Sequence, residues 1–420
     1  MERPASHSEL AELSPGLRPG PDGRLAFGGC ALADLAAEFG TAAILVDVAT
    51  LRSTAERYVE ATTAIRPNSR VHFATKAFPV PAVVGLMAEA GLYCDVASAG
   101  ELAIALAGGM PAERILLHGN AKTDLDIGAA LEAGIGLIVI DSFDDIDRIE
   151  RLAERPQPVI VRINPGVLAP THEAMATGHG ESKFGIPNGQ VEAAIARAAA
   201  SPKMEMLGLH VHIGSQILEL EPFVESVERI AALGTFDLYD LGGGLGSRYA
   251  MDEPVAPSIE DYAEALFGAA AVHLPDESVV AIEPGRSTVA PAGISLYSVV
   301  GVKRGDRTFV AIDGGMGDNM ETALYGTRFW PAIVDKDGGP ERCDVVGHHC
   351  ETGDRLATDA WLSSPEVGDL LVIPVTGAYC HSMANNYNAM PRPPVIFVED
   401  GDARVAIRRE TIADLLGRAT

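Results

Sequence analysis

Short apolar runs alternate with longer amphipathic segments along the chain, from about residue 49 to residue 287. The apolar runs are mostly rich in Val, Ile and Leu, which is typical of parallel strands covered on both faces. Each is short enough to be one strand of a compact domain. The predicted strands are Arg70–Thr75, Tyr93–Ala97, Ile115–His118, Gly136–Ile140, Val159–Ile163, Leu207–His212, Leu238–Leu241 and Val279–Ile282.

The segments between these runs carry apolar residues at helical spacing. Eight strands that alternate with helices predict an α/β fold, a (β/α)8 barrel. With one strand more or fewer, the same alternation fits a doubly wound sheet, which stays the alternative. A long loop rich in Gly and His, residues 165–187, follows the fifth strand and is a candidate functional loop. The predicted helices are Leu51–Ile65, Pro81–Ala90, Asp124–Ala133, Phe143–Ala153, Gln190–Ala199, Glu221–Ala232 and Ile259–Ala271.

Helical spacing fades after Arg286, and β-type runs follow. They predict a second, all-β domain. The early run Ala43–Val48 is left over from the barrel count and is expected to join that domain. The predicted strands there are Ile294–Val302, Thr308–Ile312, Asp344–Gly347, Asp369–Val375, Val395–Val398 and Arg404–Ile407.

The predicted division of the chain has three parts. Residues 1–28 are rich in Pro, Gly and charge and are predicted to be a mobile N-terminal arm. The barrel takes residues 49–287, and the β domain combines residues 29–48 with 288–420.

The composition excludes several classes of partner. Lys and Arg number 32 against 58 Asp and Glu, so the net charge is −26 and the surface repels nucleic acids and anionic membranes. The five cysteines are scattered without a CxxC pair, which favours a reducing cytoplasm over a disulfide framework. No apolar run approaches the about 18 residues of a membrane span, and the first residues do not resemble a signal peptide. We therefore expect a cytoplasmic protein.

The first predicted barrel strand runs into FATKAF, which puts Lys76 at its carboxyl end. Active sites of such barrels lie at that end. A lysine that loses its hydration there can attack an aldehyde and form a Schiff base. Taken alone, the segment favours an ordinary surface lysine.

The seventh strand ends in DLGGGLG, residues 240–246. Consecutive glycines let backbone N–H groups approach a phosphate, and phosphate sites after late strands are common in these barrels. The segment does not match the dinucleotide-binding pattern G-x-G-x-x-G. If Gly242 and Gly244 are its first two glycines, the position of the third is occupied by Ser247. A flexible turn is the remaining alternative.

The eighth strand ends in EPGR, residues 283–286. At a barrel mouth Glu283 can hold a proton on a heterocyclic nitrogen, and Gly285 can offer its backbone to the same phosphate. Arg286 can bind a carboxylate through two hydrogen bonds. A common and weak surface pair of Glu and Arg is the alternative.

His210 and His212 share one face of the sixth strand. They fit either a metal pair or an imidazole stacked on a cofactor ring. No other His, Asp or Glu cluster has ligand spacing at a strand end, so stacking ranks above metal and no metal site is predicted. For His210, a core position ranks first.

In the β domain, Cys350 stands beside acids in a glycine-flanked loop, where a thiol can donate a proton. A buried structural cysteine is the alternative. Together, these segments suit a cofactor that has an aldehyde, a ring nitrogen and a phosphate. Pyridoxal phosphate has all three.

A dozen motifs in this order resemble the fold-type III pyridoxal-phosphate decarboxylases, and within them most closely the diaminopimelate decarboxylases. They span roughly residues 40–415. The resemblance implies an alanine-racemase-type barrel with a β domain, a head-to-tail homodimer with shared active sites, and an amino-acid substrate. The motifs are FATKAF, YCDVASAGEL, HGNAK, VRINPG, THEAMATGHGESKFGI, HVHIGSQI, DLGGGLG, EPGR, DGGMGDN, CETGD, GAYCHSMANNYN and RRET.

The resemblance also implies roles for single residues. Lys76 forms the Schiff base with pyridoxal phosphate, His212 stacks on the ring, and Glu283 pairs with the ring nitrogen. Asp95 and Arg162 support the cofactor. The other residues implied to bind it, mainly at its phosphate, are Ser215, Gly243, Gly244, Gly285, Arg286 and Tyr379.

Further roles concern the substrate. By resemblance, Cys350 and Glu351 enter from the partner subunit, and Cys350 is the acid that protonates the carbanion. Arg286 and Tyr325 are implied to hold the distal end of the substrate, and Glu351 and Tyr379 are also implied to contact the substrate.

One position departs from the family pattern. Four residues before Tyr325, where diaminopimelate decarboxylases carry an arginine for the distal carboxylate, this chain has Glu321. An acid there repels a carboxylate unless it turns away or pairs with a base such as Arg328.

Three functions follow from these motifs. The first is decarboxylation of meso-2,6-diaminopimelate to L-lysine in lysine biosynthesis. The second is decarboxylation of a D-ornithine or D-lysine type of substrate, or of a biosynthetic intermediate. A non-catalytic regulatory homologue ranks below both, because Lys76, Cys350 and Glu351 are all present.

Overall fold

The computed structural model describes residues 3–167, 170–172, 175 and 182–419. The chain divides into two compact units. The barrel unit comprises Thr54–Gly246 and Ala256–Ser287. The sheet unit comprises the chain up to Ser53, then Ser247–Val255, and the chain from Thr288 onward. Residues 247–255, predicted as part of the barrel, therefore belong to the sheet unit.

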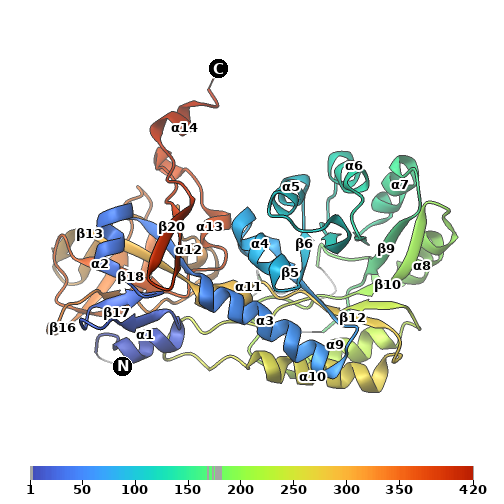
Figure 1. Cartoon of the computed structure of the whole chain (residues 1–420), viewed down its shortest axis with the longest axis horizontal. Coiled ribbons are helices and arrows are strands. Elements are labelled where there is room, and N and C mark those ends of the chain that lie inside the picture. Colours follow the sequence, from blue (N-terminus) through green and yellow to red (C-terminus); the bar gives the residue numbers. More distant parts are fainter. Residues whose placement is uncertain (1–2, 168–169, 173–174, 176–181, 420) are drawn as a thin grey trace. The chain divides into compact units, whose positions relative to one another are not determined.

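The barrel unit confirms the predicted (β/α)8 fold and excludes a doubly wound sheet. Among the described residues, eight parallel strands close in the order β10-β11-β12-β5-β6-β7-β8-β9. Figure 1 shows α5, α6 and α7 outside these strands. The strands are β5 (Arg70–Ala74), β6 (Tyr93–Val96), β7 (Ile115–Leu117), β8 (Leu137–Ile140), β9 (Gln157–Arg162), β10 (Met204–His210), β11 (Leu238–Asp240) and β12 (Val279–Ile282).

The seven helices predicted for this unit lie close to their predicted bounds, whereas α5, α11 and the short 3-10 helices had not been predicted. α6 shows why the predicted bounds hold: the Thr123 side chain caps its first turn together with Asp126, and Gly134 ends it in the left-handed region at φ 67°. The helices are α3 (Val48–Ile65), η1 (Thr75–Ala77), α4 (Pro81–Glu89), α5 (Ala99–Ala107), η2 (Ala112–Arg114), α6 (Asp124–Ala133), α7 (Phe143–Leu152), η4 (Asn188–Gln190), α8 (Val191–Ala200), α9 (Glu221–Ala231) and α10 (Ile259–His273), with α11 (Arg286–Val289) at the unit's end.

The barrel interior is packed with aliphatic side chains. Leu116, Leu137, Val139, Ile160 and Leu238 form one buried cluster from four different strands. A filled interior fixes the strand ends, where the polar side chains of a barrel site are carried.

The sheet unit is built around one large mixed sheet. The strand β4 (Ala43–Asp47) pairs with β13 (Gly293–Arg304) and with β19 (Val395–Glu399), as expected for the early strand. The main path runs β17-β16-β14-β13-β4-β19-β20, with β15 and β18 paired beside it. The other strands are β14 (Thr308–Ile312), β15 (Ala332–Ile333), β16 (Pro340–Val346), β17 (Arg355–Ser363), β18 (Leu370–Pro374) and β20 (Asp402–Ile407).

Short helices interrupt the predicted all-β pattern of this unit. Besides α2 (Leu32–Phe39), they are η5 (Ala290–Ala292), α12 (Glu321–Tyr325), α13 (Cys380–Met383), η6 (Tyr387–Ala389) and α14 (Ile412–Leu416).

The prediction of a mobile arm at residues 1–28 is wrong. The segment contains α1 (His7–Leu13) and the strands β1 (Leu17–Pro19) and β2 (Leu25–Phe27), which form a small sheet with β3 (Cys30–Ala31). Its apolar residues are few but well placed, because Leu10, Leu17, Leu25 and Phe27 are buried in the core of the sheet unit. Burial of these four side chains stabilises the folded segment, although Pro, Gly and charged residues surround them in the sequence.

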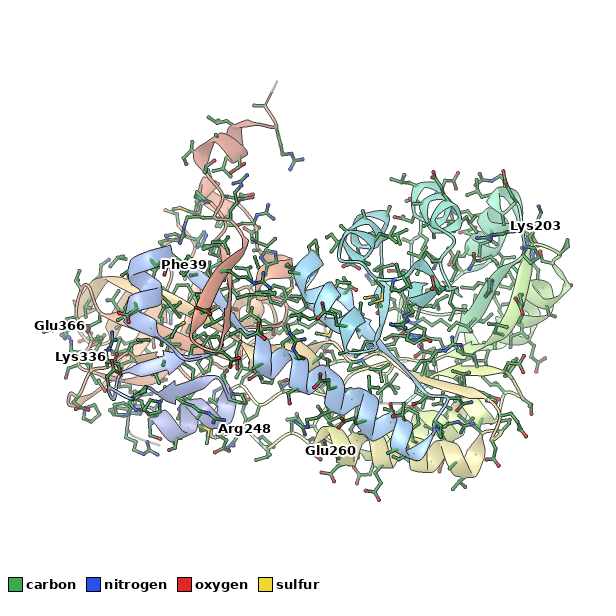
Figure 2. All side chains as sticks on the ribbon, in the orientation of Figure 1. Phe39, Lys203, Arg248, Glu260, Lys336 and Glu366 are labelled. Carbon is green, nitrogen blue, oxygen red and sulfur yellow. The ribbon has the colours of Figure 1, made fainter. Side chains whose placement is uncertain are left out.

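Charged side chains at the surface join neighbouring segments within each unit. In the sheet unit, Lys336 Nζ lies 3.0 Å from Glu366 Oε2 and 2.7 Å from Asp369 Oδ2, and Figure 2 labels Lys336 and Glu366 close together. In the barrel unit, Arg57 on α3 pairs with Glu260 on α10 at 2.8 Å. Such exposed pairs contribute little each, so the stability of both units comes mainly from their cores. Among the described residues, no helix is both long and apolar enough to span a bilayer.

Candidate active site

Five of the predicted site residues meet at the carboxyl ends of the barrel strands. Lys76 lies in η1 directly after β5, Asp95 lies on β6, and Arg162 ends β9. His212 and Glu283 come just after β10 and β12. All five line one cavity of about 370 Å³.

The Glu283 carboxylate is buried between two histidines. Its Oε1 is in short contact with His118 Nε2, and its Oε2 lies 3.2 Å from His210 Nε2. Burial alone raises the pKa of a carboxyl group, but the two imidazoles outweigh it and hold the pKa of Glu283 well below its usual value. Glu283 is therefore a carboxylate that can accept a hydrogen bond from a protonated ring nitrogen.

This cluster corrects one prediction and adds to another. One nitrogen or oxygen atom from each of His118, His210 and Glu283 lies within 4.8 Å of the others, although sequence spacing indicated no further His, Asp or Glu cluster. The three residues come from strands far apart in the chain, so spacing along the sequence could not reveal them. His210, expected as a core histidine, is fully buried but also bonds to Glu283.

Lys76 stands beside a buried acid. Its Nζ lies 3.9 Å from Asp95 Oδ2, and its side chain is 50% exposed. The sequence suggested a desolvated lysine, and the structure instead shows a half-exposed lysine side chain at the cavity. Burial raises the pKa of Asp95, against the lowering effect of His118 and Lys76.

His212 presents a neutral ring. Burial and the positive charges of Lys76 and Arg162 hold the pKa of His212 well below its usual value. Its Nδ1 accepts a hydrogen bond from the Gly243 N–H at 3.1 Å, which fixes the ring orientation. A neutral imidazole in a fixed plane is suited to stack on a flat cofactor.

Arg162 joins the barrel to the last residues of the long loop. Its Nη1 lies 3.6 Å from Asp141 Oδ2, and its guanidinium lies 4.4 Å from the centre of the Phe184 ring. Asp141 also accepts the Gly185 N–H at 2.8 Å. These contacts hold Phe184 in the cavity wall. Part of the predicted loop, residues 168–169, 173–174 and 176–181, lies outside the described residues.

The predicted phosphate residues other than Tyr379 lie on the turns after β10, β11 and β12. Arg286 Nε donates to Ser215 Oγ at 3.3 Å, which joins two of these turns. A Cβ on Gly243 would lie 2.0 Å from the Glu283 carbonyl oxygen, so this approach of two backbones requires glycine. Within the described chain, the cavity lining does not include Ser215, Gly243, Gly244, Gly285 or Arg286.

The predicted acid of the reaction belongs to the sheet unit. Cys350 is exposed, so the alternative of a buried structural cysteine is wrong. Its N–H donates to Asn388 Oδ1 at 2.9 Å, and Glu351 beside it is also exposed. The Asp354 carboxylate fixes the same loop by accepting the His349 N–H at 2.8 Å.

Three further predicted residues lie in this unit. Glu321 is fully buried in α12, and its Oε2 accepts a hydrogen bond from Thr327 Oγ1 at 2.9 Å. Tyr325 ends the same helix. Tyr379 has a φ of 63°, in the left-handed region that a bulky residue rarely adopts, and such strain is often found at functional sites.

The structure adds residues that had no predicted role. His118, Asn120 and Phe184 line the cavity. His118 and Asn120 belong to the motif HGNAK, and Phe184 belongs to the loop motif that ends in SKFGI. Both motifs contributed to the resemblance, but it assigned no role to these three side chains. The position of His118 at the end of the third barrel strand was the available signal.

These groups match the chemistry of pyridoxal phosphate. An open amine at Lys76 suits its aldehyde, the Glu283 carboxylate suits its ring nitrogen, and the hydroxyl–guanidinium pair of Ser215 and Arg286 suits its phosphate. All three lie at one end of one barrel.

Comparison with known proteins decides the family. Residues 49–290 match the family described as "Pyridoxal-dependent decarboxylase, pyridoxal binding domain". The chain belongs to the pyridoxal-dependent decarboxylases. This decarboxylase is a carboxy-lyase with pyridoxal phosphate as its cofactor, and it acts on an amino acid.

Two relatives of this decarboxylase are named diaminopimelate decarboxylase. The protein of Actinosynnema pretiosum subsp. auranticum is 46% identical over 94% of this chain and 92% of its own length. The protein of Bacillus subtilis is 40% identical over 95% of this chain and 96% of its own length.

Solved structures of the same kind are also similar. Diaminopimelate decarboxylase from Helicobacter pylori in complex with L-lysine aligns with a TM-score of 0.86 at 32% identity, covering 92% of this decarboxylase and 98% of that chain. The enzyme from M. jannaschii, also in complex with L-lysine, gives 0.89 at 32% identity, with coverages of 95% and 96%.

Proposed function

We propose that this decarboxylase acts on an amino acid of the diaminopimelate type whose distal end is not a free carboxylate. A distal ammonium, as in D-lysine or D-ornithine, and a masked carboxylate, as in a biosynthetic intermediate, both meet this description. The observation that carries the proposal is the buried Glu321 at the position where the family pattern has an arginine.

The physical reason is the sign of the charge. A charged hydrogen bond from arginine to a carboxylate contributes about 1.5–3 kcal/mol. Glutamate removes that attraction and adds repulsion. Arg286 would have to bind a distal carboxylate without the second arginine.

The second candidate substrate is meso-2,6-diaminopimelate, converted to L-lysine and carbon dioxide. The names of the relatives favour it. The bond from Thr327 to Glu321 also favours it, because a carboxylate engaged with its own helix end interferes less with the substrate.

The proposed roles of the chain's residues follow the geometry of the barrel. The Lys76 amine binds the cofactor aldehyde, Glu283 holds the proton of the ring nitrogen, and His212 covers one face of the ring. Asp95 and Arg162 support the cofactor. The proposed phosphate residues are Ser215, Gly243, Gly244, Gly285, Arg286 and Tyr379.

When bound, the pyridoxal ring draws electrons from the carbon that loses carbon dioxide. The Cys350 thiol then supplies a proton to that carbon, and Glu351 and Tyr325 contact the substrate. We further propose a homodimer in which Cys350 and Glu351 complete the site of the other subunit.

Carbon dioxide release from a panel of substrates tests the proposal. The panel is meso-diaminopimelate, its distal monoamide, D-lysine and D-ornithine, compared by kcat/KM. A higher kcat/KM for one of the last three supports it. The highest value for meso-diaminopimelate would establish the second candidate instead.

A further inference from the structure

We propose that His118 and His210 are positioning residues that keep Glu283 ionised, and through it keep a proton on the ring nitrogen of the bound cofactor. This inference rests on the proposed pairing of Glu283 with that nitrogen. It assigns a function to two histidines that touch the glutamate.

The geometry engages both oxygens of one carboxylate. His118 follows β7, His210 ends β10 and Glu283 follows β12, so three separate strands supply the groups. His118 Nε2 contacts Oε1, and His210 Nε2 lies 3.2 Å from Oε2. Glu283, His118 and His210 are 6%, 6% and 0% exposed, so water does not compete for these bonds.

The pKa values of the two histidines shift in opposite directions. Burial lowers the pKa of His118, but the carboxylates of Glu283 and Asp95 outweigh burial and raise it, which favours the imidazolium form beside Glu283. Burial lowers the pKa of His210, which stays neutral. Among the residues that the structure describes, the buried His210 Nδ1 has no hydrogen-bond partner, which fits a ring whose one proton sits on Nε2 and points at Glu283.

The other titratable groups around the cluster lie beside carboxylates of their own. His72, whose ring is also close to Glu283, has its Nδ1 3.2 Å from Asp240 Oδ2. The Lys76 amine lies on the Asp95 side, and the Arg162 guanidinium is engaged with Asp141. Without the His118 bond, a carboxyl group this deeply buried favours its protonated form. Glu283 would then take the proton that the ring nitrogen otherwise carries.

The key variants are His118→Phe, which keeps a flat ring but no donor, and His118→Gln, which keeps an amide N–H. The matched control is Gln157→Leu, which removes a buried polar side chain from the amino end of β9 in the same barrel. Circular dichroism and unfolding curves establish that each variant is folded. Should His118→Phe fail to fold, His210→Gln and His118→Asn are measured in its place.

The first readout does not depend on turnover. Apoprotein is loaded with pyridoxal phosphate labelled with 15N in its ring, and the nitrogen chemical shift reports protonation. We expect a protonated nitrogen in the natural protein, in His118→Gln and in Gln157→Leu. We expect a largely unprotonated nitrogen in His118→Phe, with cofactor Kd raised about tenfold or more.

The second readout is a double-mutant cycle with Glu283→Gln. His118→Phe alone should lower kcat about tenfold or more while KM changes little. In the Glu283→Gln background, the same change should cost less than about twofold, because the carboxylate through which His118 acts is gone.

The outcomes separate this inference from the proposed function. A natural protein that binds no pyridoxal phosphate, or releases no carbon dioxide from any amino acid, would overturn the proposed function. A natural protein that does both, with a protonated nitrogen retained in His118→Phe or with additive costs in the cycle, would overturn only the positioning role.

Discussion

The position of Lys76, directly after a barrel strand, makes its amine accessible to a cofactor. Strand β5 ends at Ala74, and the 3-10 turn η1 that follows leaves the lysine amine half exposed at the cavity, 3.9 Å from Asp95. An open amine at the carboxyl end of a barrel strand can be reached by a cofactor aldehyde, which a fully buried lysine could not be.

We expect the purified protein to be yellow and Lys76→Ala to lose both its visible absorption and nearly all turnover. The physical reason is the loss of the amine that binds the aldehyde. Absorption spectra before and after borohydride, with carbon dioxide release, measure the effect. Lys203→Ala is the control, since Lys203 donates to the Ala153 carbonyl away from the site. Natural activity in Lys76→Ala would refute the mechanism.

Glu321→Arg is expected to raise kcat/KM for meso-diaminopimelate about tenfold or more. The change removes a buried negative charge and adds a donor for the distal carboxylate, and about 1.4 kcal/mol corresponds to a factor of ten. Steady-state kinetics of the two proteins with this substrate measure it.

Glu321→Gln separates the two parts of that effect. It removes the charge but adds no cation, so its kcat/KM should lie between those of the natural protein and Glu321→Arg. If the natural protein already turns over diaminopimelate efficiently and Glu321→Arg changes little, Glu321 does not select the substrate.

At the level of elements, the sequence predicted all eight barrel strands, most of whose residues are buried. β5 to β12 are short apolar runs and were found within a few residues of their ends. The strand β17 (Arg355–Ser363) was missed, because its buried and exposed residues follow no regular alternation. Residues 1–28 were predicted as an arm because four buried apolar residues lie scattered among Pro, Gly and charge.

The site was predictable where a motif ends a strand. Lys76 and Glu283 each follow a recognisable apolar run. The pairing of Glu283 with His118 was not predictable, since the two residues are 165 positions apart and only closure of the barrel brings them together. Chain spacing therefore reveals site residues within one element but not contacts between strands.

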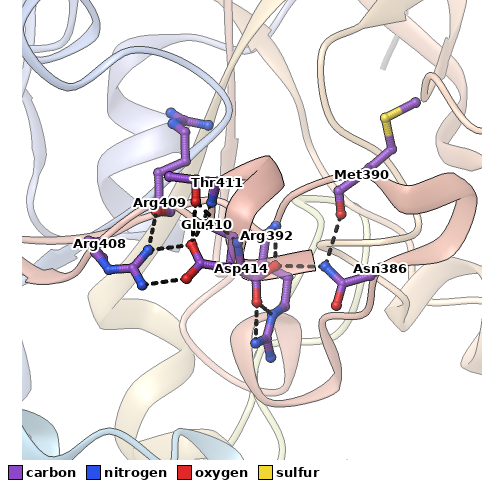
Figure 3. A network of polar contacts seen from close by, with 8 residues as sticks. All are labelled: Asn386, Met390, Arg392, Arg408, Arg409, Glu410, Thr411 and Asp414. Carbon is purple, nitrogen blue, oxygen red and sulfur yellow. Dashed lines mark hydrogen bonds and ion pairs between the residues drawn. The ribbon is translucent and has the colours of Figure 1, made fainter. Parts of the chain in front are cut away.

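The segment from β20 to α14 is held by carboxylates that bridge short elements (Figure 3). Glu410 Oε1 accepts from Arg392 Nε at 2.7 Å, and its Oε2 accepts from Asn386 Nδ2 at 2.6 Å. The side-chain bond from Arg392, with further bonds from the Arg392 N–H and from Asn386, outweighs the effect of burial and lowers the pKa of Glu410 to about 2. Because the folded-state pKa is depressed, this stabilisation is fully present above the unfolded value near 4.3 and is lost as the pH falls toward 2.

Glu410→Gln should therefore lower the free energy of unfolding by about 1–2 kcal/mol at pH 7, and by less as the pH falls below about 4. Urea unfolding of both proteins from pH 7 to pH 3 measures this difference. Glu192→Gln, at an exposed position in the first turn of α8, is the control and should change little. A difference that stays constant over this pH range would contradict the assignment to the ionised carboxylate.

At the scale of the whole molecule, the proposed chemistry is divided between the two units. Lys76 and Glu283 belong to the barrel unit, whereas Cys350, Glu351 and Tyr379 belong to the sheet unit. The exposed Cys350 and Glu351 are the groups proposed to complete a site on a partner subunit. A two-fold dimer would make two such composite sites, each using both chains.

Mixing two inactive variants tests this arrangement. Lys76→Ala loses the barrel contribution and Cys350→Ala loses the sheet contribution, so each homodimer has no intact site. After random exchange at equal amounts, half of the dimers are hybrids, and each hybrid has one intact site out of two. Activity should therefore return to about a quarter of the natural value.

Subunit exchange is verified with two differently tagged chains. The control is a mixture of Lys76→Ala with a double variant that carries both Lys76→Ala and Cys350→Ala, and this mixture should stay inactive. An exchanged mixture without recovery would mean that each site is contained in one chain.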